Sequence, residues 1–214
     1  MNRFATAARL CLPVALLAAL RLHPVLAAEV RVSPKVGEVV QAIMTEVNKR
    51  GRAQAEQNPA AARAANLATI NSAEEIPKRI EALQKYRDVV ERMIGILRAA
   101  PARAVLEAHR RGLEQAAVEE AFKAVDTGIE QAGATVIVKK LQAERRWASA
   151  VIESLELLGA NRDLWSPEDA PDGTPISIHD RGLAAEFRQA ANRIVEAERR
   201  ANKAADAVNK TRRR

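Results

Sequence analysis

The sequence predicts an all-α protein, an elongated antiparallel bundle of four to six helices or coiled-coil hairpins, with few or no strands. Apolar residues recur at steps of three and four in segment after segment, which is the period of a helix with one buried face. Aromatic residues make up only 3% of the 214 residues. A large rounded core is therefore not favoured, because bulky side chains bury the most apolar area. The abundance of Ala, Glu, Leu and Arg is typical of long helices.

The first 27 residues have the pattern of a cleavable secretory signal peptide. Arginines precede an apolar stretch over residues 10–20, which is too short for a usual membrane span. Small residues follow, and we expect cleavage after Ala27 or Ala28, which places the protein in the periplasm or outside the cell. An uncleaved anchor is the alternative. The single cysteine, Cys11, leaves with the signal peptide, so packing alone must stabilise the mature chain.

Residues 28–159 are expected to form the helical bundle. Ser33 and Pro34 indicate a helix start, with Ser at the N-cap and Pro at the first helical position. An apolar face follows, and the helix is predicted to be interrupted at residues 58–59, where a proline follows an asparagine. A short alanine-rich helix is predicted over residues 60–71.

The second long helix carries the clearest periodicity. Ser72 and Glu75 have the spacing of a capping box, which predicts the helix start. Apolar residues then follow at alternating steps near three and four and form a coiled-coil seam, namely Ile76, Ile80, Leu83, Tyr86, Val90, Ile94 and Leu97. Pro101 is expected to end or kink this helix, and it can equally open the next one.

A helical pattern continues from Pro101 to residue 158, and Gly159 is predicted to be its C-cap. We expect a joint between two helices at residues 126–128, with one long helix as the alternative. Residues 160–180 contain three prolines and a Pro-Asp-Gly turn, which exclude a helix and predict a loop or linker. The last segment, 181–214, is predicted to be a helix with a basic tail, capped by Ser177 and Asp180.

No catalytic, cofactor-binding or metal-binding set is predicted, and we expect the protein not to be an enzyme. Gly128 and Gly133 have the spacing of a phosphate loop, but Ala134 stands where that loop needs a lysine. The histidines of the mature chain, His109 and His179, lack the helical ligand spacing of zinc sites. The acidic residues of the 160–180 loop do not have the spacing of a calcium-binding EF-hand loop.

The basic C-terminal tail is the strongest feature that packing does not explain. The net charge of the chain is +7, and residues 199–214 contain a single acid, Asp206. The candidate anion-binding residues of this tail are Arg199, Arg200, Lys203, Lys210, Arg212, Arg213 and Arg214. Such clusters attract polyanions, and an anionic membrane or lipopolysaccharide surface is favoured for an exported protein. Nucleic acid is disfavoured, because no aromatic platform interleaves the charges. A solvated helix end, where cations suit the helix dipole, is the commoner explanation of such a charge run.

These observations predict an exported, non-enzymatic helical protein with a structural, adaptor or chaperone-like role. Its helical faces are expected to bind a protein partner or a second copy of the chain. An envelope, secretion or conjugation assembly is one setting for such a protein, by analogy only. The alternative is a module that binds polyanions or the envelope surface through the basic tail.

Overall fold

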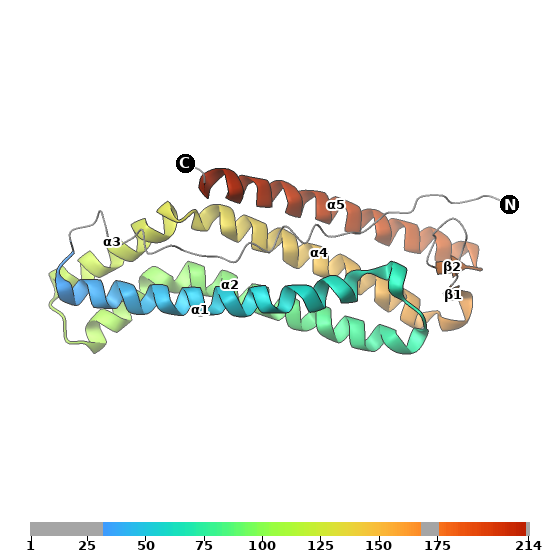
Figure 1. The fold of residues 1–214 in the computed structure, drawn as a ribbon, viewed down its shortest axis with the longest axis horizontal. Helices are drawn as coiled ribbons and strands as arrows, with labels where there is room; N and C mark the ends of the chain where they lie inside the picture. Colours follow the sequence, from blue (N-terminus) through green and yellow to red (C-terminus); the bar gives the residue numbers. More distant parts are fainter. Residues whose placement is uncertain (1–31, 168–175, 213–214) are drawn as a thin grey trace. The chain divides into compact units, whose positions relative to one another are not determined.

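The computed structural model describes residues 32–167 and 176–212, with side chains as far as residue 210. The described chain forms five α-helices and two short strands (Figure 1), so the all-α prediction is confirmed. The elements are α1 (Pro34–Ala65), α2 (Ile76–Arg110), α3 (Gln115–Gln131), α4 (Ala134–Ala160), β1 (Trp165–Pro167), β2 (Ile176–Ile178) and α5 (Arg181–Arg212). The predicted signal peptide, 1–27, and both candidate cleavage positions lie outside the described residues.

None of the described helices is both long and apolar enough to span a membrane. The chain divides into two compact units, each assembled from segments that are distant in sequence. The first unit contains Gln57–Asp88 and Ala143–Asn202, and the described part of the second contains 32–56, Val89–Gln142 and 203–212.

The core of the first unit consists of thin apolar layers between helices. Its most deeply buried side chains are Ile70, Ile76, Leu83, Leu155, Leu158 and Ile194. Two aromatic side chains of this core, Tyr86 and Trp147, meet edge to face with ring centroids 6.5 Å apart. Gly159 lies inside α4, where a Cβ atom would sit 3.3 Å from Cγ2 of Ile76. It therefore allows close approach and is not the predicted C-cap.

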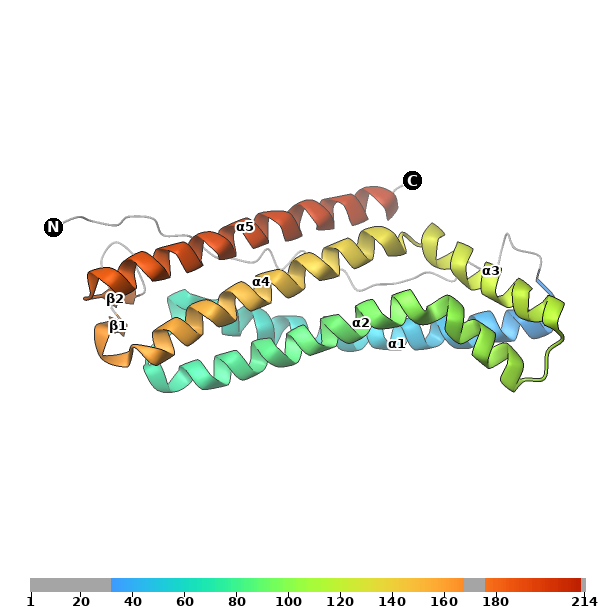
Figure 2. The same ribbon diagram turned by 180° about the vertical axis from the view of Figure 1, so that it is seen from behind.

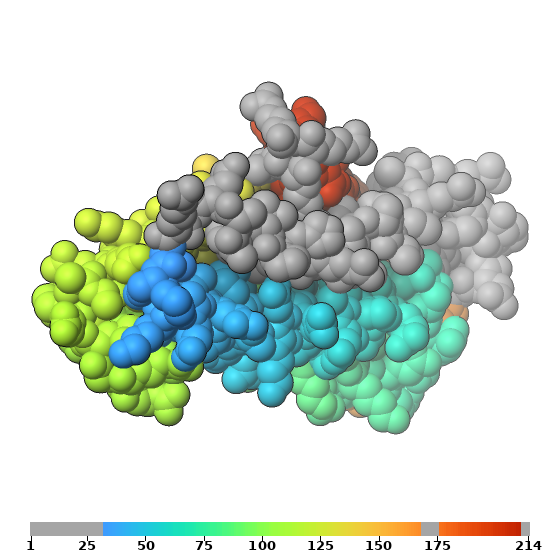
Figure 3. Space-filling model, turned by 60° about the vertical axis from the view of Figure 1, so that its left-hand side comes forward, coloured from blue at the N-terminus to red at the C-terminus, as the bar shows by residue number. Residues whose placement is uncertain are grey.

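The core of the second unit is built from the apolar faces of α1, α2, α3 and the start of α4. Its buried residues include Val36, Val39, Val47, Val90, Met93, Leu97, Val118, Val125 and Leu141. The space-filling view shows the start of α1, in blue, beside the yellow-green region that contains α3 (Figure 3). The backbone N–H of Ser33 donates a hydrogen bond to Glu120 Oε1 at 3.2 Å, which holds the start of α1 against α3.

Helix α1 begins at Pro34 as predicted, but the predicted interruption at residues 58–59 is wrong. The helix continues through Pro59 to Ala65. Proline removes one backbone hydrogen bond from a helix interior, but Asn58 and Ala61 are buried on either side of it. Packing of this face therefore outweighs the local cost. Residues 60–71 do not form a separate helix, because they contain only the end of α1 and a short 3-10 turn over Leu67–Thr69.

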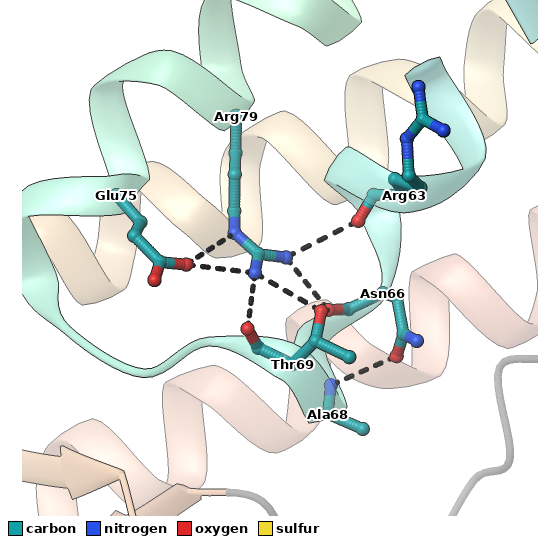
Figure 4. A network of polar contacts seen from close by, with 6 residues as sticks. All are labelled: Arg63, Asn66, Ala68, Thr69, Glu75 and Arg79. Atoms are coloured by element: carbon teal, nitrogen blue, oxygen red, sulfur yellow. Dashed lines mark hydrogen bonds and ion pairs between the residues drawn. The ribbon is translucent and has the colours of Figure 1, made fainter. Parts of the chain in front are cut away.

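The connection between α1 and α2 is held by one side chain, Arg79, and not by the predicted capping box. Arg79 Nη1 donates to the carbonyl oxygens of Asn66 at 2.8 Å and Arg63 at 3.4 Å (Figure 4). Nη2 donates to the carbonyl oxygen and to Oγ1 of Thr69, the latter at 3.1 Å. The Glu75 carboxylate pairs with Arg79 at 2.9 Å.

The predicted capping box fails because Glu75 is engaged by this arginine. The Ser72 side chain makes no cap hydrogen bond, and a 3-10 turn over Ala73–Glu75 precedes α2. A guanidinium has five N–H donors, so Arg79 can satisfy carbonyl groups at the end of α1 that have no partner within the helix. The charge also suits the negative end of the α1 dipole.

Helices α2 and α3 end close to Gly112 and Gly133, and not at the predicted positions Pro101 and 126–128. Pro101 lies inside α2, which ends at Arg110, and Gly112 adopts φ +67° in the turn that follows. Gly128 is buried within α3. The break between α3 and α4 comes at Gly133, with φ +81°, a conformation open to glycine but costly for other residues. Both breaks are visible from behind (Figure 2).

Residues 161–167 and 176–180, the described part of the predicted loop, contain no α-helix but include a 3-10 turn over Arg162–Leu164, whereas residue 160 is the last residue of α4. Strands β1 and β2 pair antiparallel, with Trp165 opposite Ile178. Trp165 is buried, and its indole N–H donates to the carbonyl oxygen of Leu158 at 2.9 Å. Leu164, which directly precedes Trp165, is exposed.

Candidate interaction surface

Helix α5 carries the predicted basic residues, and its start is fixed by one cap. Asp180 Oδ1 accepts a hydrogen bond from the backbone N–H of Leu183 at 2.8 Å, which is N-capping geometry. Ser177 lies in β2 instead of at the cap. The His179 backbone N–H donates to the Leu164 carbonyl oxygen at 2.8 Å, and its ring Nε2 lies 3.1 Å from Ser166 Oγ. These contacts tie the start of α5 to the β1–β2 pair.

One face of α5 is buried along its length. The buried residues are Leu183, Ala190, Ile194, Ala201, Ala205 and Val208. Their steps of three, four or seven residues place them on one stripe of the helix. This is the apolar stripe that the sequence predicts for the last helix.

The last turns of α5 carry four exposed charged residues on the opposite face, which we call the α5 ridge: Arg199, Lys203, Asp206 and Lys210. Their successive steps of four, three and four residues align them along the helix. None of the four forms an ion pair within the described part of the chain. Three cations and one carboxylate are therefore presented to solvent.

The other predicted anion-binding residues are placed differently. Arg200 is exposed and pairs with Glu196 one turn earlier. Arg212 is the last residue of α5, and its side chain is not described, while Arg213 and Arg214 lie outside the described residues. Of the seven candidates, the structure thus brings Arg199, Lys203 and Lys210 onto one face.

Two other charged residues of α5, Arg193 and Glu198, interact with the rest of the fold instead. Arg193 donates to the Glu153 carboxylate of α4 through Nε at 3.1 Å and Nη2 at 2.9 Å, a two-bond pairing. Glu198 is half-buried, and this burial raises the pKa of its carboxyl group. The α5 ridge differs from both, because its side chains are exposed and have no such contacts.

Helix α3 presents a second charged face that the sequence reasoning missed. Its four exposed charged residues, which we call the α3 ridge, are Glu119, Lys123, Asp126 and Glu130. They lie opposite the buried Ala121, Ala124 and Gly128. Glu119 accepts a hydrogen bond from Gln115 at 3.4 Å, and Glu130 accepts from Thr135 Oγ1 at 2.9 Å. The signal was present in the sequence as charged residues at helical spacing between the apolar positions.

The metal-binding alternatives weighed from the sequence find no support in the part of the chain that the structure describes. Within 32–167 and 176–212, no group of three or more His, Cys, Asp or Glu side chains is placed to hold a metal ion. His109 is exposed in the last turn of α2. The acids Glu168, Asp169 and Asp172 of the calcium alternative lie outside the described residues.

The chain matches no protein-family model, and comparisons with curated proteins and with solved structures give no significant match. The α3 and α5 ridges are thus the features on which a functional proposal can be built.

Proposed function

We propose that this protein is an exported, non-enzymatic interaction component that presents helix faces to a protein partner, in a structural, adaptor or chaperone-like role. An envelope or secretion assembly is a suitable setting, because the first 27 residues have the pattern of a signal peptide. The partner binds the exposed face of α5, with the buried stripe of the same helix serving as its support.

The observation that carries this proposal is the division of α5 into two faces with different uses. The stripe through Ile194 and Ala201 is buried, whereas Arg199, Lys203 and Lys210 are exposed and form no ion pair in the described chain. A helix anchored along one face holds the charges of the other in a fixed array. Fixed arrays of charge steer encounter and set the register of a partner.

The test is affinity purification of the protein from its native envelope, with co-purifying proteins identified by mass. The informative variant reverses the three ridge cations (Arg199→Glu, Lys203→Glu, Lys210→Glu). A matched control reverses three exposed cations on α2 and α4 that form no ion pair in the described chain (Lys78→Glu, Arg92→Glu, Lys139→Glu). We expect the ridge variant to lose a partner that the control variant retains. Identical partners for both variants would contradict the proposal.

A second candidate function is binding to an anionic envelope surface. The observation that favours it is the excess of exposed cations near the end of α5, with further arginines after residue 210 in sequence. Each Lys or Arg close to an anionic membrane contributes about 1 kcal/mol to binding.

This alternative predicts that removing residues 209–214 weakens binding to vesicles containing phosphatidylglycerol, or to lipopolysaccharide. Raising the salt concentration should weaken binding of the intact chain in the same way, because salt screens exposed charges. Equal binding with and without residues 209–214 would dismiss it.

A further inference from the structure

We propose that the α5 ridge binds the α3 ridge of a second copy of this chain, with the two helices antiparallel. The inference rests on the proposed function and names a partner for it. It follows from a match between two faces of the same sequence, one on α3 and one on α5.

The two ridges have the same spacing. On α3 the charged positions 119, 123, 126 and 130 are separated by four, three and four residues, and on α5 the positions 199, 203, 206 and 210 repeat these steps. Steps of four and three residues keep side chains on one face of a helix. Each ridge therefore forms a row of the same length, with its members at matching heights.

The signs of the charges on the two rows are opposite at every position when the helices run antiparallel. The facing pairs are Glu119 with Lys210, Lys123 with Asp206, Asp126 with Lys203, and Glu130 with Arg199. In a parallel alignment, Lys123 would face Lys203, and Asp126 would face Asp206. Since like charges that face each other are unfavourable, the pattern selects the antiparallel orientation.

Asp206 decides between this partner and an anionic surface. It interrupts the cations of the α5 ridge, which weakens attraction to a uniformly negative surface. A second copy supplies a cation, Lys123, at the position that faces it. Lys123, the single cation of the α3 ridge, therefore pairs with Asp206, the single carboxylate of the α5 ridge.

The association is expected to be weak and sensitive to salt. One exposed ion pair strengthens an interaction by about 1.4- to 5-fold, so four pairs and the adjoining Phe122, itself 41% exposed, support a modest affinity. We expect association to weaken by roughly ten-fold between 50 mM and 500 mM NaCl, because the Debye length shortens over this range. When both ridges of two copies meet at once, the assembly closes as a two-fold dimer.

The test is sedimentation equilibrium of the purified full chain, of three ridge variants and of a mixture of two of them. Lys123→Glu and Asp206→Lys each place like charges at one facing pair, and each should weaken self-association by about three- to ten-fold. The double variant restores opposite charges at that pair and should associate within about two-fold of the unaltered chain. A mixture of the two single variants should likewise associate more strongly than either alone.

Matched controls carry the same changes of net charge away from both ridges. Lys78→Glu and Asp88→Lys alter exposed residues of α2, and mixing them should give no gain in association. Circular dichroism checks that every variant is folded. Binding to phosphatidylglycerol vesicles separates the alternative, since Asp206→Lys should strengthen binding to an anionic surface while it weakens self-association.

A monomeric unaltered chain at low salt, or the same affinity for the single variants, the double variant and their mixture, would overturn this inference. Either result would leave the capture of a different protein from the native envelope untouched. A loss of self-association is therefore distinguishable from a failure of the proposed function.

Discussion

Arg79 shows how a single side chain replaces two local signals that the sequence suggests. The capping-box spacing of Ser72 and Glu75 is present, yet Glu75 binds the guanidinium of Arg79. The same guanidinium also reaches backbone carbonyl groups of residues 63–69, which are close to it only in the folded chain. The capping-box pattern ends at Glu75 and therefore leaves out the competing i,i+4 pair of Glu75 with Arg79.

Replacing Arg79 by alanine should lower the free energy of unfolding by about 1–3 kcal/mol, because it removes the ion-pair partner of Glu75 and one hydrogen-bond donor to the carbonyl groups between residues 63 and 69. Arg79→Lys should recover only part of this loss, since an ammonium group cannot match the planar fork. Urea unfolding monitored by circular dichroism measures both. In the control Lys85→Ala, which breaks an exposed pair with Glu81, we expect a change of about 0.5 kcal/mol or less. Equal effects of R79A and K85A would refute this role.

Glu107 makes the stability of the second unit depend on pH. Hydrogen bonds from Arg110 and Arg111 lower the pKa of its carboxyl group to about 2, below the ordinary value of 4.5. Arg111 also pairs with Glu38 of α1 at 2.7 Å. Because the folded-state pKa is the lower one, the stabilisation is complete above about pH 4.5 and is lost as the pH falls towards 2.

Glu107→Gln should therefore lower the melting temperature at pH 6, and the difference from the unaltered chain should vanish as the pH approaches 2. Thermal unfolding at half-unit steps between pH 2 and pH 6 measures this convergence. The control Glu156→Gln alters an exposed carboxylate of α4 and should give parallel curves. A constant offset between E107Q and the unaltered chain at every pH would show that the carboxylate charge is not the cause.

At the scale of the helices, periodicity predicted which faces are buried much better than it predicted where helices end. The seam from Ile76 to Leu97 is buried or half-buried throughout α2. An interruption is predicted at Pro59 and an end or kink at Pro101, but α1 and α2 continue through them, with buried residues on both sides of each proline. The actual turns are at Gly112 and Gly133, where φ is positive. Burial is a sum over many residues, whereas a helix end depends on local conformations that composition does not fix.

Neighbouring residues of α5 test its two-faced character. Ile194 is 0% exposed and Val195 is 47% exposed. Ile194→Ala should lower the free energy of unfolding by about 2–5 kcal/mol, while Val195→Ala should change it by about 0.5 kcal/mol or less. Guanidinium unfolding of the two variants gives the comparison. Similar losses for both would mean that α5 does not pack through the stripe described above.

At the scale of the whole chain, the sequence predicted the cations of the α5 ridge but not the α3 ridge. The cations at Arg199, Lys203 and Lys210 stand out in the sequence because the C-terminal tail is strongly basic. The α3 ridge does not stand out, because its charges lie among apolar residues and nearly balance. It becomes visible only when the buried face of α3 shows which side chains are left outside. The signal-peptide pattern, in turn, can be tested only on the exported chain.

Amino-terminal sequencing of the exported protein tests this processing. We expect the mature chain to begin at Ala28 or Glu29, because small residues precede both positions. Recovery of a chain that still begins at Met1 would contradict export by a cleaved signal and would favour the uncleaved anchor.

The most direct test of the central claim, that the α5 ridge is a protein-binding surface, is cross-linking inside the native cell. A photoreactive amino acid placed at position 203 should form an adduct with another protein, and a second copy of the chain is the adduct expected from the α3 match. The same group at position 78, exposed but outside both ridges, should not. Equal adduct yields at the two positions, or no protein adduct at position 203, would contradict the account.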